Sequence, residues 1–152
     1  GMLDFGRKKM REKKVEDKVE LKYGDSENLP FEDNIFDAVT VAFGVRNFEN
    51  LEKGLAEIYR VMKPNSTFVV LEFSQPEKFP IKQLYNFYFK NILPLFGRLV
   101  SKDQSAYTYL PESVNAFPYG EKFTQLLEKT GFSQTQCIPL TFGIASIYVG
   151  KK

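Results

Sequence analysis

The chain has 152 residues, of which 43% are hydrophobic and 26% charged, and its formal net charge is +2. This balance is typical of one globular domain and excludes a disordered segment, and so small a charge gives no sign of a nucleic-acid partner. With one cysteine and no histidine, the sequence excludes an internal disulfide and a histidine-based metal or nucleophile site. Because no apolar run has the length of a membrane span and no signal peptide is evident, we expect a cytoplasmic protein.

The first predicted element is a basic helix over Met2–Lys14. Its apolar residues share one stripe, and most of its other positions are Lys or Arg. A solvated helix face explains this pattern, and a contact with phosphate groups or an anionic membrane is the alternative. Val19–Tyr23 alternates apolar and polar residues and predicts a short strand. Asp25 then stands at the carboxyl end of that strand.

A buried strand is predicted over Phe36–Phe43. The run is largely apolar and is bounded by Gly44, which is typical of a strand covered on both faces in a parallel sheet. Ligands of open α/β sheets bind beyond the carboxyl ends of the strands. Arg46 and Asn47 come directly after this strand and are hard to explain by packing. They are therefore candidate site residues, with a solvated loop as the alternative.

A helix and a second strand complete a β-α-β unit. Leu51–Met62 carries its apolar residues on one face, and Asn50 is placed to cap the N-terminus of this helix. The next strand, Thr67–Phe73, contains Glu72, which needs a partner if it is buried. Strand, helix and strand at this spacing predict two parallel strands connected through the helix.

The segment 80–118 is unusually rich in aromatic and aliphatic residues. At helical spacing these residues cover more than one stripe. Such a helix is buried by ordinary packing on the sheet, or it lies against a membrane, a partner or an apolar ligand. We expect a helical lid or insertion over about residues 80–118.

The C-terminal part predicts one helix and two strands. Gly120–Thr130 has a short amphipathic pattern closed by Gly131. Thr135–Thr141 and Ile144–Val149 read as strands, and Pro139 places the first of them at a sheet edge. The expected architecture is an α/β fold whose mostly parallel sheet has an antiparallel C-terminal end. No two glycines have the G-x-G spacing of a phosphate-binding turn.

Several stretches resemble the ubiquinone/menaquinone biosynthesis C-methyltransferase (UbiE) family. They are GDSENLPFEDNIFDAVTVAFGVRNFENLEKGLAEIYRVMKP, VVLEFS, FYFKNILPLFGRLVSKDQSAYTYLPESVNAFP and LTFGIASIYVG. The resemblance covers essentially the whole chain from Met2. FGVRNF and YTYLPES are quite specific to this family, whereas GDSENLPF alone indicates only a class I methyltransferase.

The resemblance implies a Rossmann-like class I methyltransferase fold that lacks its first strands, with residues 1–152 as one N-terminally truncated domain. It implies S-adenosylmethionine as the methyl donor. Asp25 would reach the adenine amine, with the backbone of Ser26 beside it. The backbone of Ala42 and Phe43 would line the methionine end of the donor.

The resemblance also implies a polyprenyl quinol, such as demethylmenaquinol, as the acceptor. Arg46 and Asn47 would face this acceptor as catalytic residues, and Arg46 would orient a water or a phenolate while a proton leaves. Tyr107 and Tyr109 are candidates for contacts with the acceptor ring. Arg46 is expected to act in chemistry and to contribute little to folding. Segment 80–118 would cover the prenyl tail, with a peripheral membrane contact as a further expectation.

One departure from the family pattern supports an alternative function. In this family an N-terminal portion carries the first strand, the glycine-rich turn and an acidic ribose ligand, and these are missing here. The alternative is a non-catalytic remnant that acts as a dimeric binding or structural module. In either case we expect the unpaired edges of Val19–Tyr23 and Phe36–Phe43 to be covered, by pairing with each other or in a homodimer.

Overall fold

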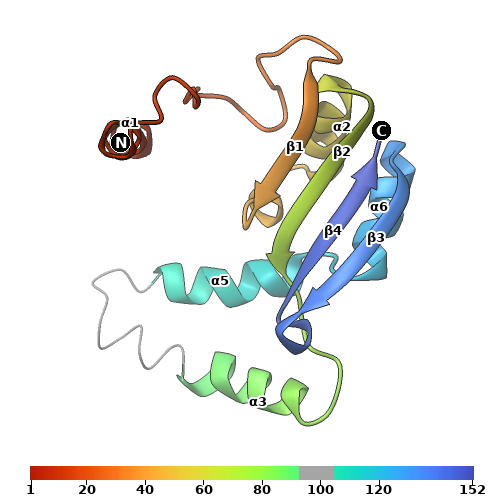
Figure 1. Cartoon of the computed structure of the whole chain (residues 1–152). Helices are drawn as coiled ribbons and strands as arrows, with labels where there is room; N and C mark the ends of the chain where they lie inside the picture. The colour runs from red at the N-terminus through yellow and green to blue at the C-terminus, as the bar shows by residue number, and fades with distance from the viewer. Residues whose placement is uncertain (93–104) are drawn as a thin grey trace.

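A computed structural model describes residues 1–92 and 105–152 of the chain, and its centre is a four-stranded sheet (Figure 1). The strands, in the order β1-β2-β4-β3, are β1 Phe36–Ala42, β2 Met62–Phe73, β4 Ala145–Lys151 and β3 Ser133–Leu140. β1 pairs with β2 in parallel, whereas β2–β4 and β4–β3 are antiparallel. The predicted α/β class with an antiparallel C-terminal end is therefore confirmed, but the described sheet is mixed and not mostly parallel, because one of its three strand pairings is parallel.

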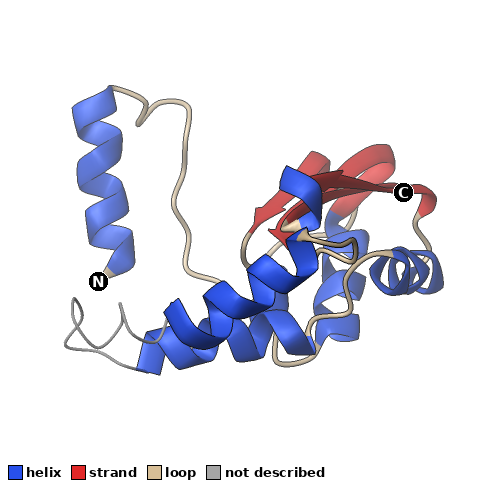
Figure 2. Ribbon diagram, turned by 90° about the horizontal axis from the view of Figure 1, so that it is seen from below, coloured by secondary structure: helices blue, strands red, loops and turns tan. Residues whose placement is uncertain are grey.

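The described helical elements precede, join and follow the strands. They are α1 Met2–Lys13, the 3-10 turn η1 Val45–Asn47, α2 Leu51–Val61, α3 Ile81–Phe87, the π-helical turn η2 Tyr88–Ile92, α5 Ser105–Ala116, α6 Glu121–Thr130 and the 3-10 turn η3 Thr141–Gly143. α2 and α6 lie on the same face of the sheet, and α3 and α5 lie near the end at which β1 and β2 finish (Figures 1 and 2). No helix among the described residues has the length and apolarity to cross a membrane.

Local sequence explains where α2 and α6 begin and end. The Asn50 side chain accepts a hydrogen bond from the Lys53 amide at 3.0 Å, which confirms the predicted N-cap of α2. Gly131 follows the C-terminus of α6 and has φ +116°, a left-handed conformation that glycine adopts without strain. Gly54 lets the Phe48 ring pack directly on α2, because a Cβ at Gly54 would lie 2.3 Å from that ring.

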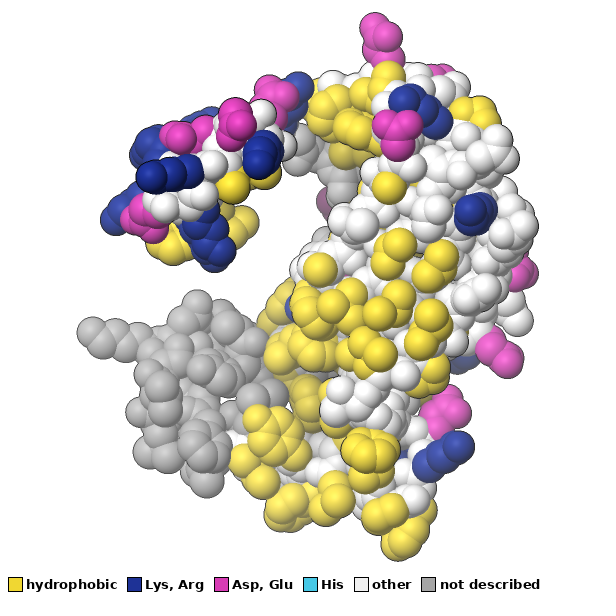
Figure 3. All heavy atoms as spheres, in the orientation of Figure 1, with side chains coloured by type: hydrophobic (Ala, Val, Ile, Leu, Met, Phe, Trp, Pro, Cys, Tyr) yellow, Lys and Arg dark blue, Asp and Glu magenta, His cyan; other side chains and the backbone are white. Residues whose placement is uncertain are grey.

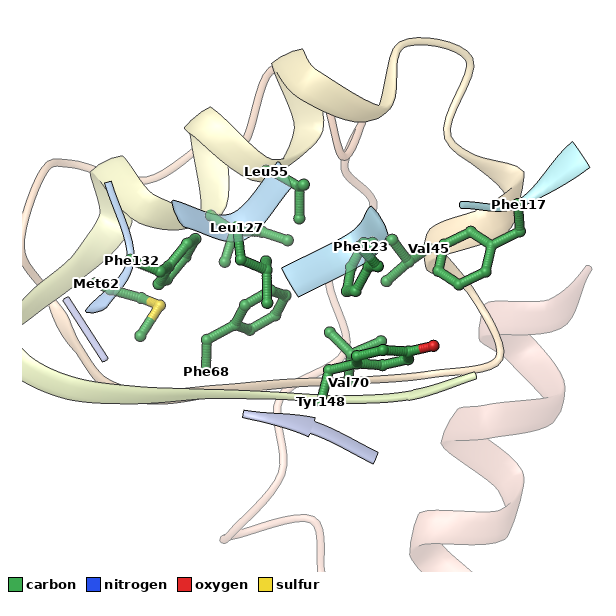
Figure 4. Close-up of a cluster of buried hydrophobic side chains, with 11 residues drawn as sticks. Val45, Leu55, Met62, Phe68, Val70, Phe117, Phe123, Leu127, Phe132 and Tyr148 are labelled. Atoms are coloured by element: carbon green, nitrogen blue, oxygen red, sulfur yellow. The ribbon is translucent and has the colours of Figure 1, made fainter. Parts of the chain in front are cut away.

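The hydrophobic core lies between the sheet and the layer formed by α2 and α6 (Figure 4). Leu55 from α2 and Leu127 from α6 meet the sheet residues Phe68, Val70 and Tyr148, all of which are buried. Along β2, every second residue from Ser66 to Glu72 is buried and the residues between them are half-buried. The sheet therefore has one well-covered face.

β1 differs from its prediction, because it is not covered on both faces. In the described sheet it pairs only with β2, and Asp37, Thr40 and Ala42 are exposed. Val39 and Val41 alternate with them and pack against the core. α2 covers one side of the strand, so alternate residues remain in solvent.

The strand predicted over Val19–Tyr23 is wrong, and this segment is a loop. Leu21 packs against α1 instead, where a Cβ on Gly6 would lie 2.8 Å from its Cδ1. α1 and this loop stand apart from the sheet (Figures 1 and 2). An extended segment becomes a strand only when a neighbour pairs with its backbone groups, and β1 does not serve as that neighbour. The predicted pairing between these two segments is therefore wrong as well.

Candidate active site

The candidate site begins where β1 turns away from the sheet. The Phe43 amide donates to the carbonyl of Leu71 at 2.8 Å, so the parallel pairing continues one residue past the strand. Phe43 then takes φ +54°, and η1 follows after Gly44. Val45 is buried in the core and fixes the turn. This anchoring holds the two polar residues that follow Val45 at the carboxyl edge of the parallel pair.

Arg46 is held by a buried ion pair with Glu72. Its Nη1 lies 2.7 Å from Glu72 Oε1 and also donates to the Phe43 carbonyl at 2.7 Å. The Arg46 side chain is 11% exposed and the Glu72 side chain is fully buried. The sequence predicted that Glu72 needs a partner, and this is confirmed. The expectation that Arg46 contributes little to folding is wrong, because its charge balances a buried carboxylate.

Glu72 also organises the backbone around it. Its Oε1 accepts a hydrogen bond from the amide of Phe73 at 2.9 Å, and its Oε2 accepts one from the amide of Arg46 at 3.3 Å. The Phe73 ring lies beside the guanidinium, 5.4 Å from Arg46 Cζ, and contacts the Phe43 ring. Both carboxylate oxygens are therefore satisfied, as a buried charge requires.

α5 docks on η1 through two side chains of one helical face. The Tyr109 hydroxyl donates to Asn47 Oδ1 at 2.8 Å, and Ser113 Oγ accepts from Arg46 Nε at 3.3 Å. Residues four apart lie on the same side of a helix, so Tyr109 and Ser113 reach neighbouring residues of the turn together. Tyr107 also belongs to α5, but its side chain lies outside the part that the structure describes.

The loop that carries Asp25 and Ser26 is fastened next to the same turn. Asp25 is exposed, and its Oδ1 accepts from the amide of Glu27 at 2.9 Å. Glu27 Oε1 in turn accepts a hydrogen bond from the amide of Asn50, which caps α2. Since Asn50 comes three residues after η1, Asp25 and the half-buried Ser26 lie on a loop that neighbours the end of β1.

A second anchor of this loop escaped the sequence analysis. Glu57 Oε2 accepts from the Leu29 amide at 2.9 Å, and Arg60 donates to the carbonyls of Leu29 and Phe31. Hydrogen bonds from Arg60 hold the pKa of the Glu57 carboxyl below its ordinary value. The i, i+3 spacing of Glu57 and Arg60 on α2 was the available signal. Nothing in that spacing shows which loop the pair binds.

An apolar pocket of about 350 Å³ lies between α3 and η3. It is lined by Ile81, Leu84, Tyr85, Tyr88, Phe89, Phe142 and Ile144. Among the described residues, the buried Tyr85 hydroxyl has no hydrogen-bond partner, and burial raises the pKa of Tyr85 to about 12. Leu84, Phe87 and Phe142 are largely exposed, and Figure 3 shows apolar side chains gathered around α3 and the nearby end of the sheet. Residues 93–104 of the predicted segment 80–118 lie outside the described residues.

The structure brings most predicted site residues to one edge of the sheet. Phe43, Arg46, Asn47 and Tyr109 are linked by direct contacts, and Ala42 is the exposed last residue of β1. Asp25 and Ser26 lie on the neighbouring loop. Sequence reasoning did not assign Glu72 and Ser113 to this site, because their partner lies 26 and 67 residues away along the chain.

Comparison with known proteins shows the family to which this chain belongs. A family model described as the ubiE/COQ5 methyltransferase family matches residues 1–152. The demethylmenaquinone methyltransferase of Bacteroides fragilis is 47% identical over all of this chain and 62% of its own length. The mitochondrial 2-methoxy-6-polyprenyl-1,4-benzoquinol methylase of Dictyostelium discoideum is 42% identical over 99% of this chain and 49% of its own length. The chain thus spans between about half and two thirds of these relatives.

Solved structures agree on the fold. A SAM-dependent methyltransferase from Aquifex aeolicus superimposes with a TM-score of 0.65 over 98% of this chain and 62% of its own, at 18% identity. An identity this low supports the fold alone, whereas the family match and the relatives above support descent. On those grounds, the chain belongs to the ubiE/COQ5 methyltransferase family.

Proposed function

We propose that this chain forms the acceptor-binding part of an S-adenosylmethionine-dependent C-methyltransferase that methylates a polyprenyl quinol such as demethylmenaquinol. The observation that carries the proposal is the linked cluster of Arg46, Glu72, Asn47 and Tyr109 at the carboxyl ends of β1 and β2. This is where open α/β sheets bind their ligands. The names of the relatives supply the reaction class.

The residues present fit one side of the methyl donor. Asp25 is exposed, and its Oδ2 makes no hydrogen bond to a described residue, so it is available to accept from the adenine amine. Ser26, Ala42 and Phe43 would border the rest of that side. When bound, the donor supplies a methyl group on a sulfonium sulfur. The chain has no glycine-rich turn to hold the other side.

On the acceptor side, Arg46 presents one nitrogen for chemistry. Nη1 and Nε are used within the protein, while Nη2 makes no hydrogen bond to a described residue. A cation beside a quinol oxygen favours the ionised quinol, whose ring carbon is the better nucleophile. Asn47 and Tyr109 would fix the ring, and the Tyr109 side chain is 52% exposed at this edge. With the donor bound, the sulfonium would supply the methyl group to the ring carbon, and the proton displaced from that carbon would pass to a water that Arg46 orients.

The apolar pocket at α3 is the proposed place for the start of the prenyl tail. Its lining is aliphatic and aromatic, and exposed apolar side chains surround it. Within a single domain 1–152, the described helical parts of the segment 80–118, namely α3, η2 and α5, would belong to a lid over this tail. The same exposed residues would let the protein rest on a membrane surface, where its acceptor is dissolved. A homodimer through the free edge of β1 is a separate prediction.

A chimera tests the proposed function. Residues 1–152 replace the matching part of the Bacteroides fragilis relative, and the product is incubated with labelled S-adenosylmethionine and a short-chain demethylmenaquinol. We expect a labelled methyl group on the ring carbon of the quinol. A chimera that folds and binds the donor but labels no quinol would contradict the proposal and favour the non-catalytic alternative.

A further inference from the structure

Glu72 occupies a position where the fold calls for an apolar residue. It follows Phe68 and Val70 at a spacing of two on the buried face of β2, and its side chain is fully buried. Phe68 and Val70 belong to the hydrophobic core, and Glu72 continues their row to the carboxyl end of the strand. A carboxylate on a core-facing row costs stability compared with an apolar residue of similar size. Its presence there needs a reason beyond packing.

Two of the three hydrogen bonds that Glu72 accepts come from the turn that carries Arg46. Both are donated by Arg46, through Nη1 at 2.7 Å and the backbone amide at 3.3 Å. The third comes from the amide of Phe73 at 2.9 Å. Arg46 Nη1 also donates to the Phe43 carbonyl, and Arg46 Nε donates to Ser113 Oγ. Together with Glu72, three hydrogen-bond partners therefore fix the plane of the guanidinium. The remaining nitrogen, Nη2, is the one without a hydrogen bond among the described residues.

We propose that Glu72 is a positioning residue for methyl transfer, which aims Arg46 Nη2 at the acceptor oxygen and moderates the charge that this oxygen meets. The inference rests on the proposed function, since it presumes a quinol at this edge. Glu72 acts in two ways. It fixes the direction of the donor nitrogen, and its negative charge offsets part of the positive charge of Arg46.

The second action makes the proposal distinguishable from a purely structural role. The quinol hydroxyl must ionise to react, a nearby cation lowers its pKa, and a nearby anion raises it. Removing the charge of Glu72 leaves Arg46 uncompensated, so the acceptor ionises at lower pH. Among the described residues, Tyr109 and Glu112 on α5 and Asp25 in the adjoining loop are ionisable, and none of them makes a hydrogen bond to Arg46. A loss of folded protein would scale the rate without moving its pH dependence.

The experiment compares E72Q, E72D and V70A in the active chimera. Val70 is the matched control, since it is buried on the same face of β2 and truncating it removes packing but no charge. For each variant the folded fraction is measured by circular dichroism, and kcat, KM and the pH profile are expressed per folded molecule.

We expect E72Q to lower kcat at least tenfold, with little change in the KM for the methyl donor, and to move the rising limb of the pH profile down by about one unit. E72D keeps the negative charge but has a side chain one methylene shorter, so kcat should fall while the rising limb of the pH profile stays at the same pH. V70A should lower the melting temperature and leave kcat, KM and the pH profile per folded molecule unchanged. An unmoved limb in E72Q would overturn the proposal.

If E72Q does not fold, E72D decides the matter, and an unchanged kcat per folded molecule in E72D overturns the proposal. An inactive unmutated chimera would instead contradict the proposed function. The two failures are therefore separate.

Discussion

The Tyr109 hydroxyl donates a hydrogen bond to Asn47 Oδ1 across 62 residues of sequence, at a distance of 2.8 Å. This bond joins α5 to the turn after β1, and Ser113 adds a second link one helical turn further along. The position of α5 is therefore coupled to the position of the polar residues at the site. Any movement of α5 away from the turn would break both hydrogen bonds.

Replacing Tyr109 by Phe tests this coupling. The ring stays, but the hydrogen bond to Asn47 is lost, and a bond of this kind contributes about 1 kcal/mol. In the chimera we expect the KM for the quinol to rise by roughly fivefold, since 1.4 kcal/mol corresponds to tenfold. Y59F is the control, because Tyr59 lies on α2 and packs on Phe132 away from the turn. Equal KM values for Y109F and the unmutated chimera would argue against the coupling.

Truncating Arg46 should damage both activity and stability. In R46A the buried Glu72 loses its counter-charge, and breaking a buried pair in this way costs about 3 kcal/mol. Activity should also fall by roughly 10²-fold per folded molecule, the effect of removing one electrostatic donor. The double variant R46M/E72L should regain the melting temperature without regaining activity. Should the double variant recover turnover, Arg46 would have only a structural role.

Two buried tyrosines predict how stability changes in alkali. Burial raises the pKa of Tyr85 and of Tyr148 to about 12. Since the folded-state pKa is raised, the stabilisation by the neutral phenols is complete below the unfolded value near 10 and is lost as pH rises toward 12. Urea titrations of the chain between pH 8 and 12 should therefore show a fall in the free energy of unfolding that begins near pH 10.

The same two residues differ at neutral pH, and Phe variants separate them. The Tyr148 oxygen accepts from the Gly120 amide at 2.8 Å, so Y148F should lose about 1 kcal/mol by leaving that amide unpaired. The Tyr85 hydroxyl has no partner among the described residues, so Y85F should be neutral or stabilising. Y85F should also reduce the fall in the free energy of unfolding between pH 10 and 12. Equal destabilisation by both variants would show that the Tyr85 hydroxyl is bonded in solution.

The isolated chain should bind S-adenosylmethionine weakly. It carries Asp25 but no glycine-rich turn, and losing about two charge-assisted hydrogen bonds of roughly 1.5–3 kcal/mol each moves a micromolar site to about millimolar. Titration calorimetry should show no heat change that fits a micromolar dissociation constant. A clear micromolar isotherm would mean that the remaining residues, or a second copy, complete the pocket.

Exposed apolar residues at α3 should carry any contact with a bilayer. Leu84 and Phe87 are 61% and 59% exposed, and both belong to α3. We expect the chain to sediment with phosphatidylcholine–phosphatidylglycerol vesicles and the L84S/F87S variant to remain in the supernatant. High salt provides the control, because it screens attraction to the basic α1 but leaves apolar contacts in place. Sedimentation that is lost in salt and unaffected by L84S/F87S would assign the contact to α1.

Local sequence signals predicted local structure well. Asn50 was identified as a cap and Gly131 as a helix end, because a side-chain acceptor and a left-handed conformation are properties of single residues. The buried state of Glu72 was flagged by its apolar neighbours. The partner of Glu72 could not be identified from the sequence, since Arg46 lies 26 residues away and only the parallel pairing of β1 and β2 brings the two residues together.

The errors have the same origin. Alternation in Val19–Tyr23 indicates an extended segment, but a strand also needs a neighbour, and the pattern carries no information about one. The apolar run of β1 suggested two covered faces, whereas coverage depends on where a strand falls in the sheet. Arg46 was taken as free of packing because its position after a strand was visible, while the carboxylate behind it was not.

The polar contacts that hold the turn after β1 come from one contiguous stretch of the chain. Phe43, Arg46, Asn47, Glu72, Tyr109 and Ser113 all lie between residues 43 and 113. Recombination with breakpoints outside this interval would pass the turn, its counter-charge and its helix to a recipient together. A breakpoint between residues 46 and 72 would separate Arg46 from Glu72, and a breakpoint between residues 72 and 109 would separate this ion pair from Tyr109 and Ser113 of α5. Acceptor preference in this family should therefore be inherited, and be transplantable, as a single block.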